Sequence, residues 1–125
     1  MDNHLQWIGL ALIIGFLMLK ALRKKQMKPL IEQYLAHNAI IVDVRTPQEF
    51  NQEHCPNSLN IPLNLLESRY TELDQNQNII LCCASGGRSG MALSFLKSKG
   101  YNKIINAGSW TNVKNKEIFY GSFKH

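Results

Sequence analysis

The sequence predicts an α/β domain with a parallel sheet of four or five strands flanked by helices, preceded by one transmembrane helix. Short apolar, β-branched runs at Ile40 to Val44 and Asn78 to Ile80 have the composition of buried parallel strands, and helical patterns alternate with them. A long apolar stretch near the amino terminus predicts the membrane segment. The chain has 125 residues, enough for a single domain.

The first predicted element is the transmembrane helix, Leu5 to Leu22, which follows an N-terminal tail of residues 1–4. The 13 residues from Trp7 to Leu19 contain no charged side chain, and apolar residues would cover every face of this helix, unlike a surface amphipathic helix. Its length would be about 27 Å, close to the hydrocarbon thickness of a bilayer. Trp7 and Lys20 stand at opposite ends, where an aromatic ring and a snorkelling lysine suit the membrane interfaces.

The basic charge of the chain is concentrated beside that stretch. Only one of nine acidic residues precedes Pro29, whereas five of 14 basic residues do: Lys20, Arg23, Lys24, Lys25 and Lys28. Because these charges follow the apolar run, we expect a retained anchor and not a cleaved signal peptide; a buried helix of the domain is the alternative. The asymmetry predicts an outside N-terminus, a basic linker over 23–28 and a cytoplasmic domain, as in the bacterial inner membrane. A net charge of +5 from one short cluster gives no reason to expect nucleic-acid binding.

The predicted domain covers residues 29–125. Pro29 suits the first position of a helix that continues to His37, because the N–H that proline lacks would be unpaired there. After the first strand, Thr46-Pro47-Gln48-Glu49 is typical of a helix start, with an N-cap, a proline and a glutamate three residues after the cap. Further helices are expected over Leu63 to Tyr70 and Ser89 to Lys99, and further strands over Asn78 to Cys82 and Lys103 to Asn106.

A glycine-rich segment, Cys83-Ala84-Ser85-Gly86-Gly87-Arg88-Ser89, joins the second strand to the next helix. Such a loop lies at the carboxyl edge of a parallel sheet, where open α/β folds bind ligands. Gly86 and Gly87 allow several backbone N–H groups to point at one place, and the helix start and Arg88 add positive charge. This environment would keep a cysteine at its centre as the nucleophilic thiolate, and it would also attract an anionic substrate.

The three cysteines are Cys55, Cys82 and Cys83, and their spacing predicts neither a disulfide framework nor a metal site. Four residues separate Cys83 from Arg88, whereas five separate Cys82 from it. The shorter loop suits a single sulfur atom on the nucleophile, and the longer loop is wide enough for a tetrahedral phosphate. As the last residue of its strand, Cys82 should point opposite to its neighbour and pack in the core.

The segment from Cys83 to Ser89 resembles the active-site loop of single-domain rhodaneses, the thiosulfate sulfurtransferases. Ile41 to Phe50, followed by His54 to Pro62, is similar to the family's D-x-R strand end, short E-F helix and H-I-P-G-A-x-N-I-P stretch. Gly100 to Gly108 looks like the closing strand, most of all that of the small phage-shock type. The resemblance covers about Ile40 to Trp110. It departs from the family pattern at Cys55, Asn57, Ser58, Ser109 and Trp110, and it lacks an obvious first strand before Ile40.

The resemblance implies sulfur transfer in two steps, with no cofactor and no metal. The Cys83 thiolate would attack the outer sulfur of thiosulfate or of a persulfide, become a persulfide itself, and pass that sulfur to a thiol or to cyanide. The groups implied to hold the sulfur or the anionic donor belong to Ala84, Ser85, Gly86, Gly87, Arg88 and Ser89. Arg45, at the same sheet edge, has two interpretations: a structural contact with Asp43, or attraction of the donor.

Two other functions remain open. Counted from Cys82, the run C-C-A-S-G-G-R-S approximates the C-x5-R-S loop of a tyrosine phosphatase, which would suit a phosphatase or an arsenate reductase. That interpretation expects a histidine where Leu81 stands, and an aspartate general acid for which neither Asp43 nor Asp74 is obviously placed. The third interpretation is a membrane-tethered module that only binds a partner, although the intact cysteine loop argues against it.

Overall fold

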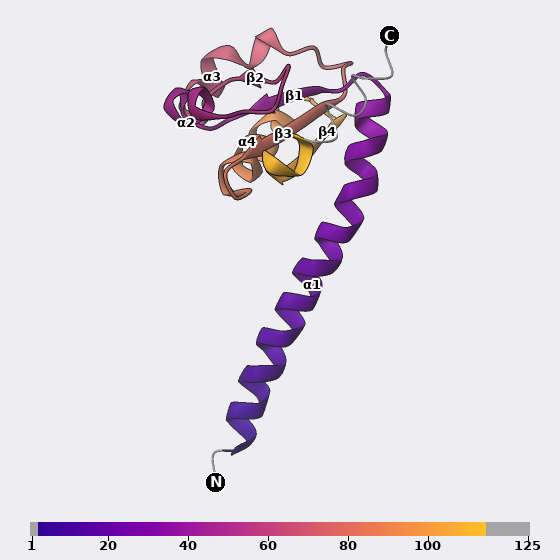
Figure 1. Ribbon diagram of the computed structural model, residues 1–125, viewed down its shortest axis with the longest axis vertical. Coiled ribbons are helices and arrows are strands. Elements are labelled where there is room, and N and C mark those ends of the chain that lie inside the picture. Colours follow the sequence, from indigo (N-terminus) through magenta and orange to yellow (C-terminus); the bar gives the residue numbers. More distant parts are fainter. Residues whose placement is uncertain (1–2, 115–125) are drawn as a thin grey trace. The chain divides into compact units, whose positions relative to one another are not determined.

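The computed structural model describes residues 3–114, which form two compact units with a boundary between Leu30 and Ile31. The first unit is a single helix and the second is an α/β domain (Figure 1). Helix α1 (Asn3–Ala36) makes up all of the described first unit and also supplies the opening residues of the second. The ends of the predicted tail and domain, residues 1–2 and 115–125, lie outside the described residues.

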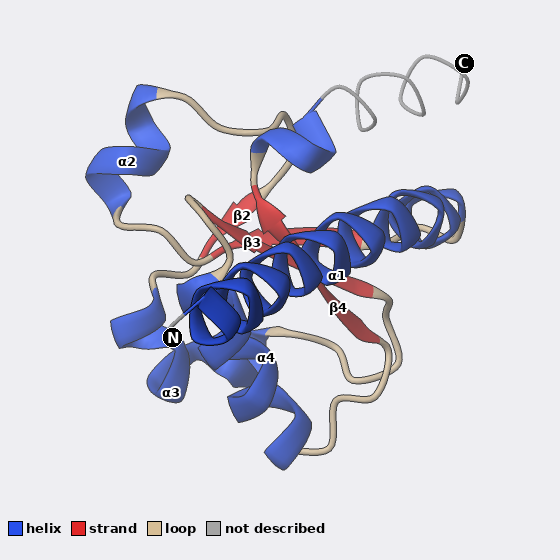
Figure 2. Cartoon of the chain, turned by 90° about the horizontal axis from the view of Figure 1, so that it is seen from below, coloured by secondary structure: helices blue, strands red, loops and turns tan. Residues whose placement is uncertain are grey.

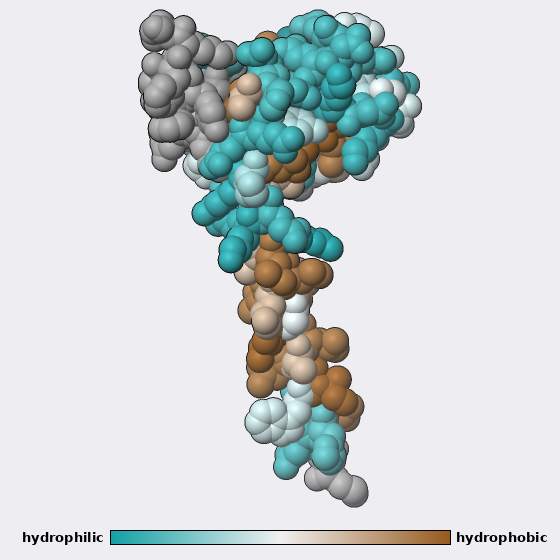
Figure 3. Space-filling view, turned by 90° about the vertical axis from the view of Figure 1, so that its right-hand side faces the viewer, coloured by the Kyte–Doolittle hydropathy of each residue, from teal (hydrophilic) through white to brown (hydrophobic). Residues whose placement is uncertain are grey.

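Within the first unit, α1 carries a long band of exposed apolar side chains. Its most apolar window of 18 residues is entirely unburied, and the helix is long and apolar enough to cross a membrane. Figure 3 shows this band in brown, with hydrophilic residues at both ends of it. By length and composition, α1 is therefore a candidate membrane span.

Helix α1 runs without interruption through residues 23–28 and Pro29. The prediction that a new helix begins at Pro29 is therefore wrong, because Pro29 lies inside α1. A proline inside a helix removes one hydrogen bond to the carbonyl four residues earlier. The neighbours Met27, Lys28 and Leu30 are strong helix formers and sustain the helix across that missing bond.

The sheet of the second unit has four strands, all parallel, in the order β2-β1-β3-β4. The strands are β1 (Ile40–Asp43), β2 (Leu59–Asn60), β3 (Ile79–Cys83) and β4 (Ile104–Ser109). Every residue of β3 is buried, because this strand is central and covered on both faces. The predicted α/β class is confirmed, and the described residues contain the smaller of the two predicted strand numbers.

Helices α2 (Pro47–Gln52), α3 (Leu66–Arg69) and α4 (Gly87–Ser98) follow strands in the second unit, with 3-10 turns η1 (Leu63–Leu65) and η2 (Tyr70–Glu72) around α3. Residues 111–114, after β4, are also helical. The predicted capping box starts α2: Glu49 N–H donates to Thr46 Oγ1 at 3.2 Å, and Thr46 N–H donates to Glu49 Oε1 at 3.1 Å. Helix α4 begins two residues earlier than predicted, directly after Gly86.

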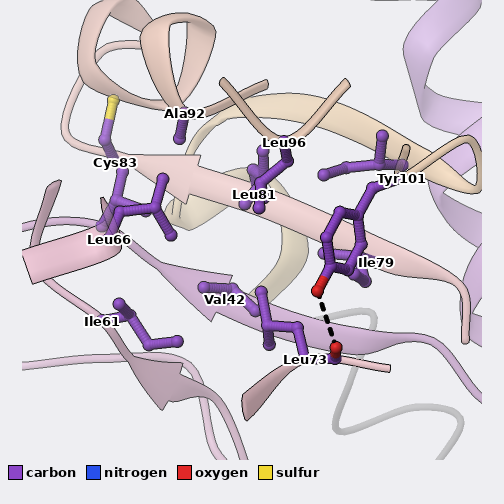
Figure 4. Close-up of a cluster of buried hydrophobic side chains, with 12 residues drawn as sticks. Val42, Ile61, Leu66, Leu73, Ile79, Leu81, Cys83, Ala92, Leu96 and Tyr101 are labelled. Atoms are coloured by element: carbon purple, nitrogen blue, oxygen red, sulfur yellow. Dashed lines mark hydrogen bonds between the residues drawn. The ribbon is translucent and has the colours of Figure 1, made fainter. Parts of the chain in front are cut away.

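The main core lies between the sheet and helices α3 and α4, which are on the same side of the strands (Figure 2). Side chains alternate along β3, so Leu81 and Cys83 face this core while Cys82 points to the opposite face. Figure 4 shows the Cys83 sulfur on the side of β3 where Ala92 of α4 lies. The core cluster contains Val42, Val44, Ile61, Leu66, Leu73, Ile79, Leu81, Cys83, Ala92, Leu96, Tyr101 and Ile104.

Candidate active site

The turn between β3 and α4 wraps around the sulfur atom of Cys83. Gly86 N–H donates a hydrogen bond to Cys83 Sγ at 2.9 Å. Ser89 Oγ, in the first turn of α4, lies 3.3 Å from the same sulfur. The side chain of Ser89 is fully buried, whereas Ala84 and Ser85 at the tip of the turn are exposed. The sulfur therefore sits in a small polar cradle with an exposed rim.

Gly86 adopts a backbone conformation that this cradle requires. Its φ of +107° belongs to the left-handed region, which a residue with a side chain rarely adopts. An added Cβ at Gly86 would also lie 3.4 Å from the Cα of Gly108 in β4. The carbonyl of Gly86 accepts hydrogen bonds from Gly90 N–H at 2.9 Å and from Asn106 Nδ2 at 3.2 Å. These contacts hold the carbonyl of Gly86, the same residue whose N–H points at Cys83.

The two adjacent cysteines have opposite environments. Burial raises the pKa of Cys83, but hydrogen bonds from the Ser89 hydroxyl and from the N–H groups of Ser89, Gly86 and Ser85 outweigh it, and the pKa falls below its ordinary value. Burial raises the pKa of Cys82, and the nearby Asp43 carboxylate raises it further. Cys83 is therefore the more acidic thiol. Cys82 is fully buried on the opposite face of β3, as the alternation of the strand predicts.

Asn106, in β4, is hydrogen-bonded to two residues that contact the sulfur, Ser89 and Gly86. Its Oδ1 accepts hydrogen bonds from Ser89 Oγ at 2.6 Å and from Gly108 N–H at 2.9 Å, and its Nδ2 donates to Gly86. The sequence pattern marks this residue only as part of a strand. The available signal is that Asn106 follows two buried isoleucines, in a position where an amide side chain needs a specific hydrogen-bonding partner.

Arg88, the last charged residue of the loop, is paired with Glu49 of α2. Its Nη1 and Nη2 donate to the two carboxylate oxygens of Glu49 at 2.6 and 3.0 Å, in a bidentate arrangement. Hydrogen bonding from Arg88 is the largest cause that lowers the pKa of Glu49, to about 2. The capping box identifies Glu49 in the sequence, but nothing there points to its contact with Arg88.

Arg45 is buried and hydrogen-bonded to structural partners. Its Nε and Nη2 donate to the Asp43 carboxylate at 2.9 and 2.8 Å, and Nη2 also donates to the carbonyl of Glu53 at 2.8 Å. The guanidinium carbon lies 4.8 Å from the ring centroid of Trp110. Only 5% of Arg45 is exposed. This geometry supports the structural interpretation of Arg45, and its role in attracting the donor stays a prediction.

Trp110 links the end of β4 to β3, the strand that ends at Cys83. Its backbone N–H donates to the carbonyl of Cys83 at 2.8 Å, after a register shift between Leu81 and Cys83 in the pairing of β3 with β4. The carbonyl of Cys83 is thereby held while the side chain faces α4. Three of the predicted loop residues donate hydrogen bonds to the sulfur of Cys83: Ser85, Gly86 and Ser89. Arg88 is bound to Glu49 instead.

Residues 23–116 match the family model described as the rhodanese-like domain. The chain belongs to the rhodanese-like family. Among curated relatives, the thiosulfate sulfurtransferase PspE of Escherichia coli K12 is 34% identical over 74 residues, which are 58% of this chain and 71% of that protein. A sulfurtransferase of Allochromatium vinosum is 33% identical over 69 residues, which are 55% of this chain and 64% of that one. The chain spans less than two thirds of the length of this relative, and only 36% of a Bacillus subtilis relative.

Solved rhodanese structures have the same fold. A structure described as rhodanese with anions, from E. coli, matches with a TM-score of 0.56 at 34% identity and covers 59% of this chain and 89% of that one. A rhodanese-related protein from Thermoplasma volcanium matches with a TM-score of 0.56 at 30% identity, covering 63% and 78% of the two chains. The rhodanese-like domain is thus the α/β unit described above, and sulfurtransferases are among its relatives.

Proposed function

We propose that this rhodanese-like protein is a membrane-anchored sulfurtransferase that carries sulfane sulfur as a persulfide on Cys83. The observation that supports this proposal most strongly is the 2.9 Å hydrogen bond from Gly86 N–H to Cys83 Sγ. Together with the contact to Ser89, it makes Cys83 the more acidic of the two adjacent thiols. A thiolate held by N–H groups is both a nucleophile and the centre of an anion site.

In the first step, the Cys83 thiolate attacks the outer sulfur of the donor. A new S–S bond forms at Cys83 as the donor's own bond to that sulfur breaks, and the leaving group departs with the electron pair. Thiosulfate would release sulfite, and a persulfide would release a thiolate. The terminal sulfur of the Cys83 persulfide would carry the negative charge, and we expect the N–H groups of Ser85 and Gly86, which donate to Cys83 Sγ, to stabilise it.

In the second step, an acceptor thiolate or cyanide attacks the terminal sulfur, and Cys83 leaves as a thiolate. The product is a new persulfide or thiocyanate. A lowered pKa helps here as well, because a more acidic thiol is a better leaving group in exchange at sulfur. The same hydrogen bonds therefore assist both half-reactions, and neither step requires a cofactor.

The orientation of Cys82 argues against the phosphatase and arsenate reductase alternative. Cys82 points to the face of β3 opposite Cys83, and its pKa is raised, which favours the unreactive thiol. The loop counted from Cys83 is also closed tightly around one sulfur atom by Gly86 and Ser89. A purely partner-binding module would have no need of a cysteine in this environment.

We also propose that residues 5–22 anchor the protein in a membrane, with the N-terminus outside and the rhodanese-like domain in the cytoplasm. Exposed apolar side chains along this part of α1 support the anchor. The basic residues at 20–28 would then lie among the headgroups on the cytoplasmic side. We expect this arrangement in a bacterial inner membrane.

An activity assay on the full-length protein in detergent tests the proposed chemistry. We expect thiocyanate from thiosulfate and cyanide, no hydrolysis of an aryl phosphate, loss of activity in C83S, and retention of activity in C82S. The C82S variant is the matched control, because it makes the same atomic change one residue away. Aryl phosphate hydrolysis that depends on Cys82, without thiocyanate formation, would replace this proposal with the phosphatase.

A further inference from the structure

The arginines near the Cys83 loop are neutralised by carboxylates. Arg88 donates from both terminal nitrogens to Glu49 at 2.6 and 3.0 Å, and Arg45 is paired with Asp43 at 2.8 Å. Each pair sums to zero charge. The attraction that the loop offers to an anion therefore comes mainly from backbone N–H groups around Cys83 and from the positive end of α4.

The Glu49 carboxylate is held in place from two sides. Its Oε1 accepts hydrogen bonds from both the N–H and the hydroxyl of Thr46, each at 3.1 Å, and it binds Arg88 as well. Moving Glu49 away from Arg88 would break the bidentate pair and disturb the cap of α2. An incoming donor thus meets a negative charge fixed beside the only arginine of the loop.

The number of charges on the donor decides how much this carboxylate matters. Thiosulfate carries two negative charges, and its sulfonate end must lie outside the sulfur cradle once its outer sulfur approaches Cys83. There it would either compete with Glu49 for Arg88 or bind next to the carboxylate, and like charges in close contact repel. A donor with a single negative charge on its reacting sulfur places that charge among the N–H groups of the cradle.

We infer that Glu49 is a specificity-determining residue that makes the site favour singly charged sulfane-sulfur donors, such as persulfides, over dianionic thiosulfate. This inference rests on the proposed sulfur transfer through Cys83 and adds the class of donor. Glu49 touches Arg88 and not the sulfur, so it acts on the donor's charge and leaves the bond-making step unchanged.

Two donors that differ by one charge separate this effect from the chemistry. Thiosulfate and the methanethiosulfonate ion both present a terminal sulfur bonded to a sulfonyl sulfur. In each case the Cys83 thiolate forms a bond to the terminal sulfur and the S–S bond of the donor breaks. Sulfite leaves from thiosulfate, and methanesulfinate leaves from methanethiosulfonate, with the electron pair in both cases.

The experiment measures kcat/KM of the full-length protein for both donors with one acceptor thiol. In E49Q the amide can still accept from Thr46, while the charge is gone. We expect kcat/KM for thiosulfate to rise about tenfold or more, mainly through KM, and kcat/KM for methanethiosulfonate to change less than about twofold. The matched control is E72Q, which removes a charge from another bidentate pair, Arg69–Glu72, and should change neither value.

Equal changes for the two donors in E49Q, or a fall in kcat/KM for thiosulfate, would overturn the inference. A second variant, E49A, must shift the donor preference in the same direction, and thermal unfolding of both variants verifies that they fold. Failure of the proposed function gives a different result. In that case neither donor leaves sulfur on Cys83 in the wild type or in any variant.

Discussion

Ser89 donates its hydroxyl hydrogen to Asn106 Oδ1 at 2.6 Å, while the same hydroxyl oxygen lies 3.3 Å from Cys83 Sγ. Two further hydrogen bonds fix the orientation of the Asn106 amide: its Oδ1 accepts from Gly108 N–H, and its Nδ2 donates to the Gly86 carbonyl. A hydroxyl has one hydrogen. Ser89 can therefore accept a hydrogen bond from the Cys83 thiol while bound to Asn106, but it must turn from Asn106 to donate to the thiolate. The ionisation of Cys83 is coupled to this hydroxyl.

Replacing Ser89 by alanine should raise the pKa of Cys83. The hydroxyl is the largest of the contributions that lower this pKa against the effect of burial. Only the thiolate reacts with an alkylating reagent, so the reaction rate rises as pH passes upward through the pKa. We expect the rate profile of S89A to move to higher pH, with a severalfold lower rate at pH 7.

The control for this measurement is S94A, which removes an exposed hydroxyl from the same helix and should leave the profile in place. The rate of alkylation should be followed for Cys83 itself, by peptide mapping, because the chain also contains Cys55 and Cys82. An S89A profile that coincides with wild type would mean that the Ser89 hydroxyl does not stabilise the thiolate.

The variant N106D should raise the pKa of Cys83 as well, for a different reason. An aspartate keeps an acceptor for Ser89, but it places a negative charge next to Ser89, which itself contacts the sulfur. It also lacks the N–H donor that binds the Gly86 carbonyl. We expect slower alkylation at pH 7 and a profile displaced upward, measured as for S89A. A faster reaction in N106D would contradict the assigned orientation of the Asn106 amide.

The variant Y101F should destabilise the domain without a direct effect on the loop. The Tyr101 hydroxyl lies 2.8 Å from the carbonyl oxygens of both Tyr70 and Leu73, which share its one hydrogen, and the residue is only 3% exposed. Loss of the donor leaves buried acceptors without it, which costs about 1–3 kcal/mol. Thermal or denaturant unfolding measures the change, and unchanged stability would contradict the role assigned to this hydroxyl.

A charge in the apolar band of α1 should weaken membrane association. Ile13 is 58% exposed in the structure and belongs to the segment proposed to span the bilayer. An aspartate near the centre of a membrane helix costs about 3 kcal/mol of insertion free energy. We expect I13D to appear partly in the soluble fraction after alkaline washing of membranes, whereas the control I13L stays bound. A spanning helix would be contradicted if I13D stayed entirely in the membrane fraction and protease cleaved it as readily as the wild type.

Local patterns predicted much of this molecule. The Thr46–Glu49 cap and the β-branched strands depend on neighbours in the sequence, and the opposite faces of Cys82 and Cys83 follow from the alternation of a strand. Strand ends are predictable only to within a few residues, because pairing with another strand decides where β3 stops.

Long-range contacts could not be predicted in this way. The Arg88–Glu49 pair joins residues 39 apart in the sequence, and Ser89 and Asn106 are 17 apart. Both contacts depend on how strand register and helix packing bring separate elements to one sheet edge. At Pro29 the local pattern was misleading. A proline is typical of a helix start, but the neighbouring helix formers continue α1 through it.

The location of the transferred sulfur shows whether Cys83 is the residue that carries it. Full-length protein would be incubated with thiosulfate and, separately, with methanethiosulfonate, then digested and analysed by mass spectrometry without reduction. We expect a mass increase of one sulfur atom on Cys83, lost again when an acceptor thiol is added, with Cys82 unmodified. Sulfur found on Cys82 would contradict the assignment to Cys83. So would the absence of added sulfur from both cysteines after treatment with either donor.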